Sequence, residues 1–153
     1  MNSYSVSVKK IVEDFHLTIV HASSDFDTVQ VMVEEVSRPG LQLSGFFNHF
    51  ERMRLQVIGN VESAYINTLS HERLLTVFDE LFSCKIPAMV FARNIEPKPE
   101  CLEMAKKHDI TILRCMESTS YIVSSLGVYL KNALAPKISR HGVLVEVYGE
   151  GLL

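Results

Sequence analysis

The sequence of 153 residues has few cysteines, and their number and spacing argue against a fold held by zinc and against one held by disulfides. Cys84, Cys101 and Cys115 are odd in number and far apart, and none belongs to a C-x-x-C pair. Neither a zinc site nor a framework of disulfides is therefore indicated. We expect reduced, mostly buried cysteines and no bound metal.

The sequence also has no run of basic residues and no long apolar segment. Fifteen lysines and arginines against eighteen acids give a formal net charge of −3, so there is no electrostatic footprint for nucleic acid or an anionic membrane. No apolar stretch approaches the length of a membrane span, and the first residues lack the basic and apolar regions of a signal peptide. We expect a cytoplasmic protein that binds neither nucleic acid nor membrane.

What is present is a pattern of alternating helix and strand signals. With 47% hydrophobic and 22% charged residues, the chain can bury one core. Strands are predicted at 17–20, 30–36, 54–58, 86–92 and 110–113, and helices at 8–15, at 74–82, from Pro97 through Ala105, and from a cap at Ser118 or Thr119 to Leu134. The alternation predicts an α/β fold, with a mostly parallel sheet flanked by helices on both faces.

The last residues of the sequence have the pattern of the first strand of a second domain. Val143, Val145 and Val147 recur at every second position, and Gly149-Glu150-Gly151 is typical of a turn. We expect a domain over 1–134, followed by a linker and the truncated start of a second domain over 135–153, which contributes a C-terminal strand stub. The two glycines are not a dinucleotide fingerprint, because the third glycine and the following helix are missing.

Several blocks of the sequence resemble one family in the order in which that family has them. Leu134-Ala-Pro136 followed by His141-Gly-Val-Leu-Val-Glu-Val-Tyr-Gly-Glu-Gly-Leu-Leu153 is similar to the domain junction of bacterial HPr kinase/phosphorylases. The other blocks are Arg38-Pro-Gly-Leu-Gln-Leu-Ser-Gly-Phe-Phe47, Arg54-Leu-Gln-Val-Ile-Gly59 with Glu62, Ile86-Pro-Ala-Met-Val-Phe-Ala-Arg93 with Pro97, and Leu113-Arg114 with Ser118-Thr-Ser120. The resemblance covers almost the whole chain.

This resemblance implies a function for the full-length protein. Members of the family use ATP or pyrophosphate with magnesium to phosphorylate a serine of the phosphocarrier protein HPr, and they reverse the step by phosphorolysis. They act in carbon catabolite repression and form hexamers. The family's GxxxxGK[ST] phosphate loop is absent from this sequence, so we expect an inactive N-terminal domain, regulatory or scaffolding, that needs no cofactor itself.

The resemblance also assigns a role to one histidine. The family's match to His141 lies beside the phosphate loop and is counted among the catalytic residues, so His141 is a catalytic candidate in the full-length enzyme only. The other five histidines show no ligand spacing and are expected to be surface or structural.

A second hypothesis comes from the placement of three arginines. Arg38, Arg93 and Arg114 each fall at or just beyond the carboxyl end of a predicted strand, and Ser118 and Thr119 begin a helix near the same edge. Parallel strands share that edge, where ligands tend to bind, and a helix N-terminus favours anions. The chain could therefore be a non-catalytic regulatory module that binds a small anion or a partner. The alternative is that these arginines pair with Glu35, Glu96 and Glu117 and only tie loops together.

Three aromatic residues near the middle of the chain permit two interpretations. Phe46, Phe47 and Phe50 could form a patch that binds a partner, or a short helix that packs on the sheet. Aromatic residues at such spacing usually belong to a core, which favours the helix.

Overall fold

The computed structural model of this chain describes residues 4–136. His141 and the expected strand stub lie outside the described residues. The elements are, in order, β1 (Val6–Ser7), α1 (Val8–Phe15), β2 (Thr18–His21), β3 (Gln30–Val31), β4 (Val36–Ser37), α2 (Gly40–Leu43), β5 (Leu55–Ile58), α3 (Asn60–Ile66), α4 (His71–Ser83), β6 (Met89–Phe91), α5 (Pro99–His108), β7 (Ile112–Arg114) and α6 (Thr119–Leu134).

A five-stranded sheet forms the centre of the molecule. Its strand order is β2-β7-β6-β5-β4, with β4, β5, β6 and β7 mutually parallel and β2 antiparallel at the edge beside β7. Every residue of β5 and of β6 is buried, as expected for parallel strands that are covered on both faces. The predicted α/β class is confirmed.

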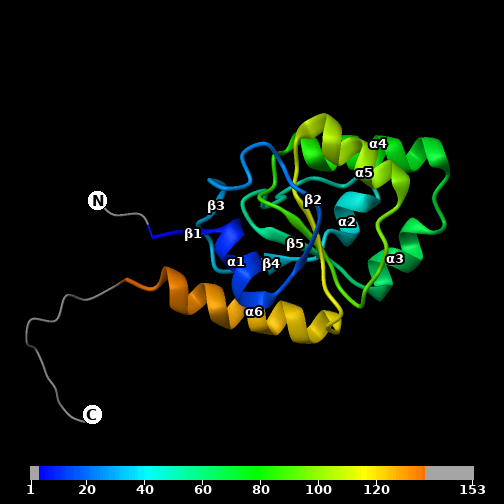
Figure 1. Cartoon of the computed structure of the whole chain (residues 1–153). Coiled ribbons are helices and arrows are strands. Elements are labelled where there is room, and N and C mark those ends of the chain that lie inside the picture. The colour runs from blue at the N-terminus through cyan, green and yellow to red at the C-terminus, as the bar shows by residue number, and fades with distance from the viewer. Residues whose placement is uncertain (1–3, 137–153) are drawn as a thin grey trace, which may run out of the picture.

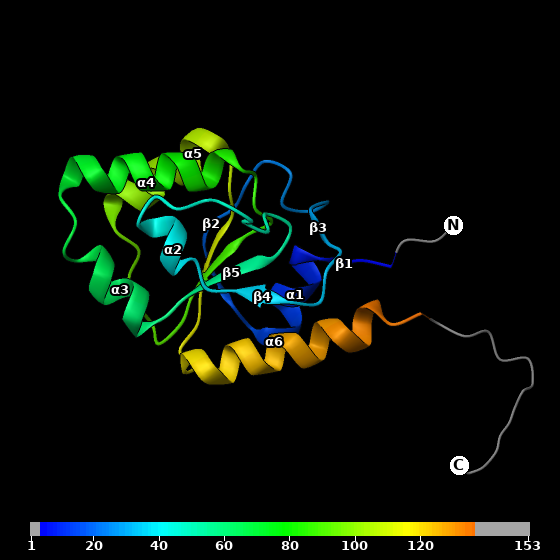
Figure 2. The same ribbon diagram turned by 180° about the vertical axis from the view of Figure 1, so that it is seen from behind.

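Helices cover both faces of this sheet. In both views α4 and α5 lie along one side and α6 along the other (Figure 1 and Figure 2). Two buried apolar clusters fill the layers between. One holds Val57, Val90 and Leu113 against α1 and α6, and the other holds Ile58, Met89 and Ile112 against α2, α4 and α5. Alternate residues of each strand thus face opposite layers, which is the two-residue period of a strand.

The single strand predicted at 30–36 is wrong. Its beginning, β3, pairs antiparallel with β1 in a separate two-stranded sheet, and its end, β4, joins the main sheet beside β5. Glu34 and Glu35 lie exposed in the crossover between the two short strands. Because Val31, Val33 and Val36 continue the strand signal through the crossover, the local pattern could not separate the two strands.

Two other local predictions need correction. The helix predicted from Pro97 begins at Pro99, which takes the first helical position, while Pro97 is buried in the preceding loop. The short helix lies at α2, before the aromatic residues, and not across 46–50. Phe47 and Phe50 pack edge to face, with ring centroids 5.6 Å apart, against the α4 layer, whereas Phe46 is half exposed.

Across residues 4–136, no helix has the length and apolar character that crossing a membrane requires.

Candidate functional site

The carboxyl ends of the four parallel strands meet at one edge of the sheet. Ser37, Ile58, Phe91 and Arg114 are the last residues of β4, β5, β6 and β7. The chain leaves β7 through residues 115–118 and enters α6 at Thr119. This is the edge to which sequence reasoning assigned an anion site.

Arg93 lies in a strained loop just beyond β6. Both Arg93 and Asn94 have left-handed backbones, with φ of 56° and 55°, which is uncommon for residues other than glycine. The loop is fixed to the segment after β7, because the Arg93 N–H donates to the Glu117 carbonyl (2.8 Å) and the Asn94 N–H donates to the Cys115 carbonyl (2.7 Å). The Arg93 residue itself is exposed. No ion pair to Arg93 occurs within residues 4–136, so Arg93 does not form the expected pair with Glu96 or Glu117.

Arg114 is half-buried beside the same loop. Its Nη2 donates to the Asn94 carbonyl oxygen at 2.8 Å. Its Nε atom is buried and has no hydrogen-bond partner among the described residues. A buried N–H of a cation without a partner is costly, so this edge retains a donor that an anion could use.

Ser118 and Thr119 begin the longest described helix. Ser118 is the N-cap of α6, and its Oγ accepts a hydrogen bond from the Tyr121 N–H at 3.2 Å, which confirms the predicted cap. Thr119 is 5% exposed, and its Oγ1 has no partner in the described part of the chain. Its side chain lies against Gly59 at the end of β5. Arg93, Arg114, Ser118 and Thr119 therefore lie at one edge of the sheet, the edge predicted for them from the sequence.

Arg38 lies on the same edge but is engaged elsewhere. It follows β4, which is separated from β6 by β5. Its Nη2 donates to Glu62 Oε1 at 2.9 Å, and the Gly59 N–H donates to the same oxygen at 2.8 Å. The partner expected for Arg38, Glu35, is instead paired with Arg54 at 3.3 Å. Arg38 is thus tied to the start of α3.

Glu62 is the structural residue whose role sequence reasoning missed, together with α3 itself. It is only 6% exposed although it is charged. Glu62 occupies the third position of α3, from which a glutamate can accept from the N–H of the capping residue. The spacing from Gly59 to Glu62 was the available signal, although glycine has no side chain to complete the reciprocal bond.

The described edge offers donors for an anion and no evident nucleophile. Cys115 follows β7 at this edge, but burial raises the pKa of its thiol, which makes it a poor nucleophile at neutral pH. All three cysteines are unpaired, with Cys101 and Cys115 buried and Cys84 half-buried, as predicted. No three His, Cys, Asp or Glu side chains gather as metal ligands within residues 4–136. The arrangement can hold negative charge, and we find no acid–base chemistry in it.

Comparison with known proteins gives one consistent family. Residues 6–130 match the family described as HPr Serine kinase N terminus. The chain is 41% identical over 150 residues to an HPr kinase/phosphorylase of Lachnoclostridium phytofermentans, and 37% identical over 150 residues to one of Caldicellulosiruptor bescii. Each alignment covers 98% of this chain and 48% of the relative, so the chain spans about half the length of these curated relatives.

A solved structure shares the fold at low identity. It is described as the CBS and DRTGG domains of the regulatory region of Clostridium perfringens pyrophosphatase, complexed with the activator diadenosine tetraphosphate. The TM-score is 0.55 at 15% identity, over 84% of this chain and 50% of that one. At that identity the likeness concerns the fold alone. The match over residues 6–130, together with relatives that align to nearly the whole chain, shows that this chain belongs to the HPr serine kinase N-terminal domain family.

Proposed function

We propose that this chain is the N-terminal, regulatory or scaffolding domain of a bifunctional HPr serine kinase/phosphorylase that acts in carbon catabolite repression. The observation that carries the proposal is the family match over residues 6–130, with relatives of about twice the length. In this proposal the full-length protein works in the cytoplasm as a hexamer. It uses ATP or pyrophosphate with magnesium to phosphorylate HPr, and it dephosphorylates HPr by phosphorolysis.

The 153 residues alone are proposed to be inactive. A P-loop holds phosphates with backbone N–H groups, a lysine and a magnesium-binding hydroxyl. The GxxxxG spacing from Gly40 to Gly45 is followed by Phe46 and Phe47, where a P-loop has lysine and then serine or threonine. Gly40–Leu43 is also a four-residue helix and so cannot form that loop.

Phosphate transfer to HPr tests both parts of this proposal. The 153-residue chain, incubated with HPr, magnesium and either ATP or pyrophosphate, should give no phosphoserine by mass spectrometry. The full-length protein should give it, and His141→Ala in that protein should slow the reaction in both directions. Phosphorylation by the 153-residue chain would contradict inactivity. A full-length protein that does not modify HPr would contradict the family function.

The second candidate function is a small-anion sensor at the carboxyl edge of the sheet. Three features support it: the exposed Arg93, the unpartnered Nε of Arg114, and the buried, unpartnered Oγ1 of Thr119 at the start of α6. Ser118 caps this helix, and the backbone N–H groups of Thr119 and Ser120 in its first turn would be the donors. Arg38 would join only by giving up its pair with Glu62. The ligand class is a phosphate group, free or on a metabolite.

Thermal denaturation with phosphate, sugar phosphates and nucleotides tests this sensor. A ligand should raise the midpoint of wild type and not that of Arg93→Ala. Lys106→Ala is the matched control, because Lys106 is an exposed cation on α5. A stabilisation that survives Arg93→Ala and disappears in moderate salt would be non-specific screening, and would reject the site.

A further inference from the structure

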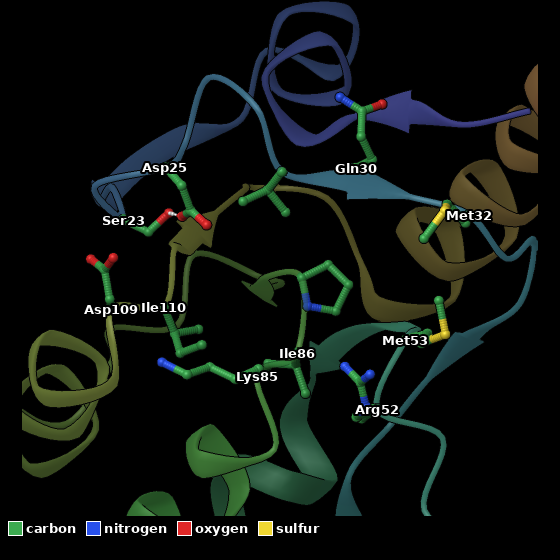
Figure 3. A pocket seen from close by; sticks show the side chains of 12 residues that line it. Ser23, Asp25, Gln30, Met32, Arg52, Met53, Lys85, Ile86, Asp109 and Ile110 are labelled. Carbon is green, nitrogen blue, oxygen red and sulfur yellow. Dashed lines mark hydrogen bonds between the residues drawn. The ribbon is translucent and has the colours of Figure 1, made fainter. Parts of the chain in front are cut away.

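A cavity of about 430 Å³ lies at the opposite, amino-terminal edge of the parallel sheet. Its floor comes from residues just before strands: Arg52 and Met53 precede β5, Ile86 and Pro87 precede β6, and Ile110 precedes β7. The loop after β2 and the strand β3 close it from the other side (Figure 3). The volume falls within the range of small-molecule sites. The cavity is separate from the carboxyl edge of the sheet, where Arg93 and Arg114 lie, because β5, β6 and β7 run from one edge to the other.

Half of the residues that line this cavity are apolar. Among them Ile86 and Ile110 are buried side chains of the core. Met32 and Met53 both line the cavity at the right of the view (Figure 3), and they are 47% and 39% exposed. Flexible, polarisable thioethers adapt their shape to flat rings and make favourable sulfur–aromatic contacts. Two half-exposed methionines at one end of a cavity therefore suit a ring better than a polar sugar.

The acidic residues of the cavity serve its closing loop. The hydroxyl of Ser23 donates to Asp25 at 2.6 Å, and both the N–H and the hydroxyl of Ser24 donate to Asp109. The Ser23 N–H also donates to Thr111 Oγ1 at 3.0 Å. These bonds attach the loop after β2 to the segment before β7. The carboxylates are thus acceptors that hold the wall in place.

The two cations of the cavity differ in what they contact. Lys85 Nζ donates to the carbonyl of His108 at 2.6 Å, at the end of α5, so the fold already uses it. Arg52 has no hydrogen bond or ion pair within residues 4–136. Figure 3 shows its side chain directed toward the cavity beside Ile86 and Met53. A guanidinium group free of carboxylates binds carboxylate or phosphate through paired hydrogen bonds.

We infer that this cavity binds a small organic anion with a flat ring, whose ring packs on Met32 and Met53 and whose carboxylate or phosphate is held by Arg52. This site is independent of the proposed catalytic function and of the anion site proposed at the carboxyl edge of the sheet. Its ligand class combines two requirements, a ring for the apolar end and a negative charge for Arg52.

Methionine methyl resonances of the 153-residue chain test the inference directly. The titrants are AMP (ring and phosphate), indole-3-carboxylate (ring and carboxylate), adenosine (ring alone) and inorganic phosphate (anion alone). AMP, indole-3-carboxylate or both should shift the Met32 and Met53 resonances saturably. The titrant that does so shows whether Arg52 binds a phosphate or a carboxylate. Met116, exposed after β7 at the other edge of the sheet, should not move. Met89 and Met104 are buried in the same apolar cluster as Ile86 and Ile110 of the cavity wall, so they serve as reporters of the fold.

Arg52 variants decide whether the charge matters. Arg52→Ala should weaken the binding about tenfold or more, and Arg52→Lys should restore part of it. Lys106→Ala is the matched control and should leave affinity unchanged. Unshifted Met89 and Met104 resonances in each variant report an intact fold. The inference is overturned if neither ring-bearing anion shifts the Met32 and Met53 resonances. It is also overturned if adenosine or phosphate binds with the same affinity as the ring-bearing anion, or if Arg52→Ala leaves that affinity unchanged.

Discussion

Gly59, at the end of β5, lies so close to Thr119 that a Cβ atom on Gly59 would be only 2.6 Å from the Thr119 Cγ2 methyl group. Real Cβ atoms essentially never come so near another heavy atom. The contact joins the start of α3 to the start of α6 at the carboxyl edge of the sheet. The missing side chain of Gly59 is therefore what allows α6 to begin directly beside β5.

Gly59→Ala should destabilise the domain by about 1–3 kcal/mol, because overpacking in a dense interior forces side chains and backbone to move. Gly127→Ala is the matched control. Nothing lies within 4 Å of its added Cβ, and alanine in the interior of α6 should instead stabilise by about 0.5–1 kcal/mol. Urea denaturation of the three proteins measures both effects.

A double substitution identifies the cause of the Gly59 effect. Thr119→Ala removes both Thr119 atoms nearest to the added Cβ, so Gly59→Ala should cost less in that background than in wild type. Equal costs in the two backgrounds would mean that the backbone of Gly59, and not the contact with Thr119, is responsible.

Removing Arg38 should leave a buried carboxylate without its cation. Glu62 is 6% exposed and shares one oxygen between Arg38 and the Gly59 N–H. We expect Arg38→Ala to cost about 1–2 kcal/mol, at the lower end for a charged hydrogen bond because the Arg38 side chain is 40% exposed. Glu62→Gln in the same background should recover part of that loss, since the neutral amide oxygen can still accept from Gly59. If the double variant is less stable than Arg38→Ala, the buried charge is not the cause.

The three cysteines should differ in reactivity toward iodoacetamide in the folded chain. Burial raises the pKa of all three thiols, and Cys101 is completely buried in the α4–α5 layer. Because only the thiolate reacts, half-buried Cys84 should be alkylated first and Cys101 last. Mass spectrometry of timed samples measures the order, and the same reaction in urea should label all three alike. Alkylation of Cys101 as fast as Cys84 in native buffer would contradict this packing.

Sequence reasoning succeeded where one element carries its own signal. The apolar runs of β5 and β6, the helical stripe of α4 and the Ser118 cap are local features, and the structure has all of them. It failed where the answer depends on a distant partner. The pair of Arg38 with Glu62 spans 24 residues, and the strand signal at 30–36 could not show that its two halves pair with different sheets.

The cavity at the amino edge had no sequence signal at all. It is lined by short segments that precede β5, β6 and β7, and by the loop after β2. No one of these segments is unusual in composition. Only the strand order brings Arg52, Met32 and Asp109 to one place, whereas the opposite edge was predictable because the carboxyl ends of parallel strands share an edge.

Stability should fall in acid because hydrogen bonds in the folded chain lower the pKa of four carboxyl groups among the described residues. The pKa of Asp109 is lowered chiefly by the bonds from Ser24, that of Asp79 by His108, that of Asp14 by Tyr129 and that of Glu100 by His71. A lowered pKa means that the unfolded chain binds protons more readily than the folded one. The stabilisation is therefore fully present above the ordinary values of 3.8 for aspartate and 4.5 for glutamate, and it is lost as pH falls through the lower folded values.

Asp109→Asn isolates one of these groups. Asp109 caps α5 in the left-handed conformation, with φ of 62°, which asparagine also tolerates, and the amide oxygen can still accept from Ser24. The variant should be less stable than wild type at pH 7, and the difference should shrink as pH falls below about 4. Glu34→Gln removes an exposed carboxylate in the crossover between β3 and β4 and is the control for the loss of one surface charge at pH 7. Urea denaturation at a series of pH values from 7 to 3 measures the difference, and a gap between Asp109→Asn and wild type that stays constant with pH would show that the Ser24 bonds do not favour the ionised form.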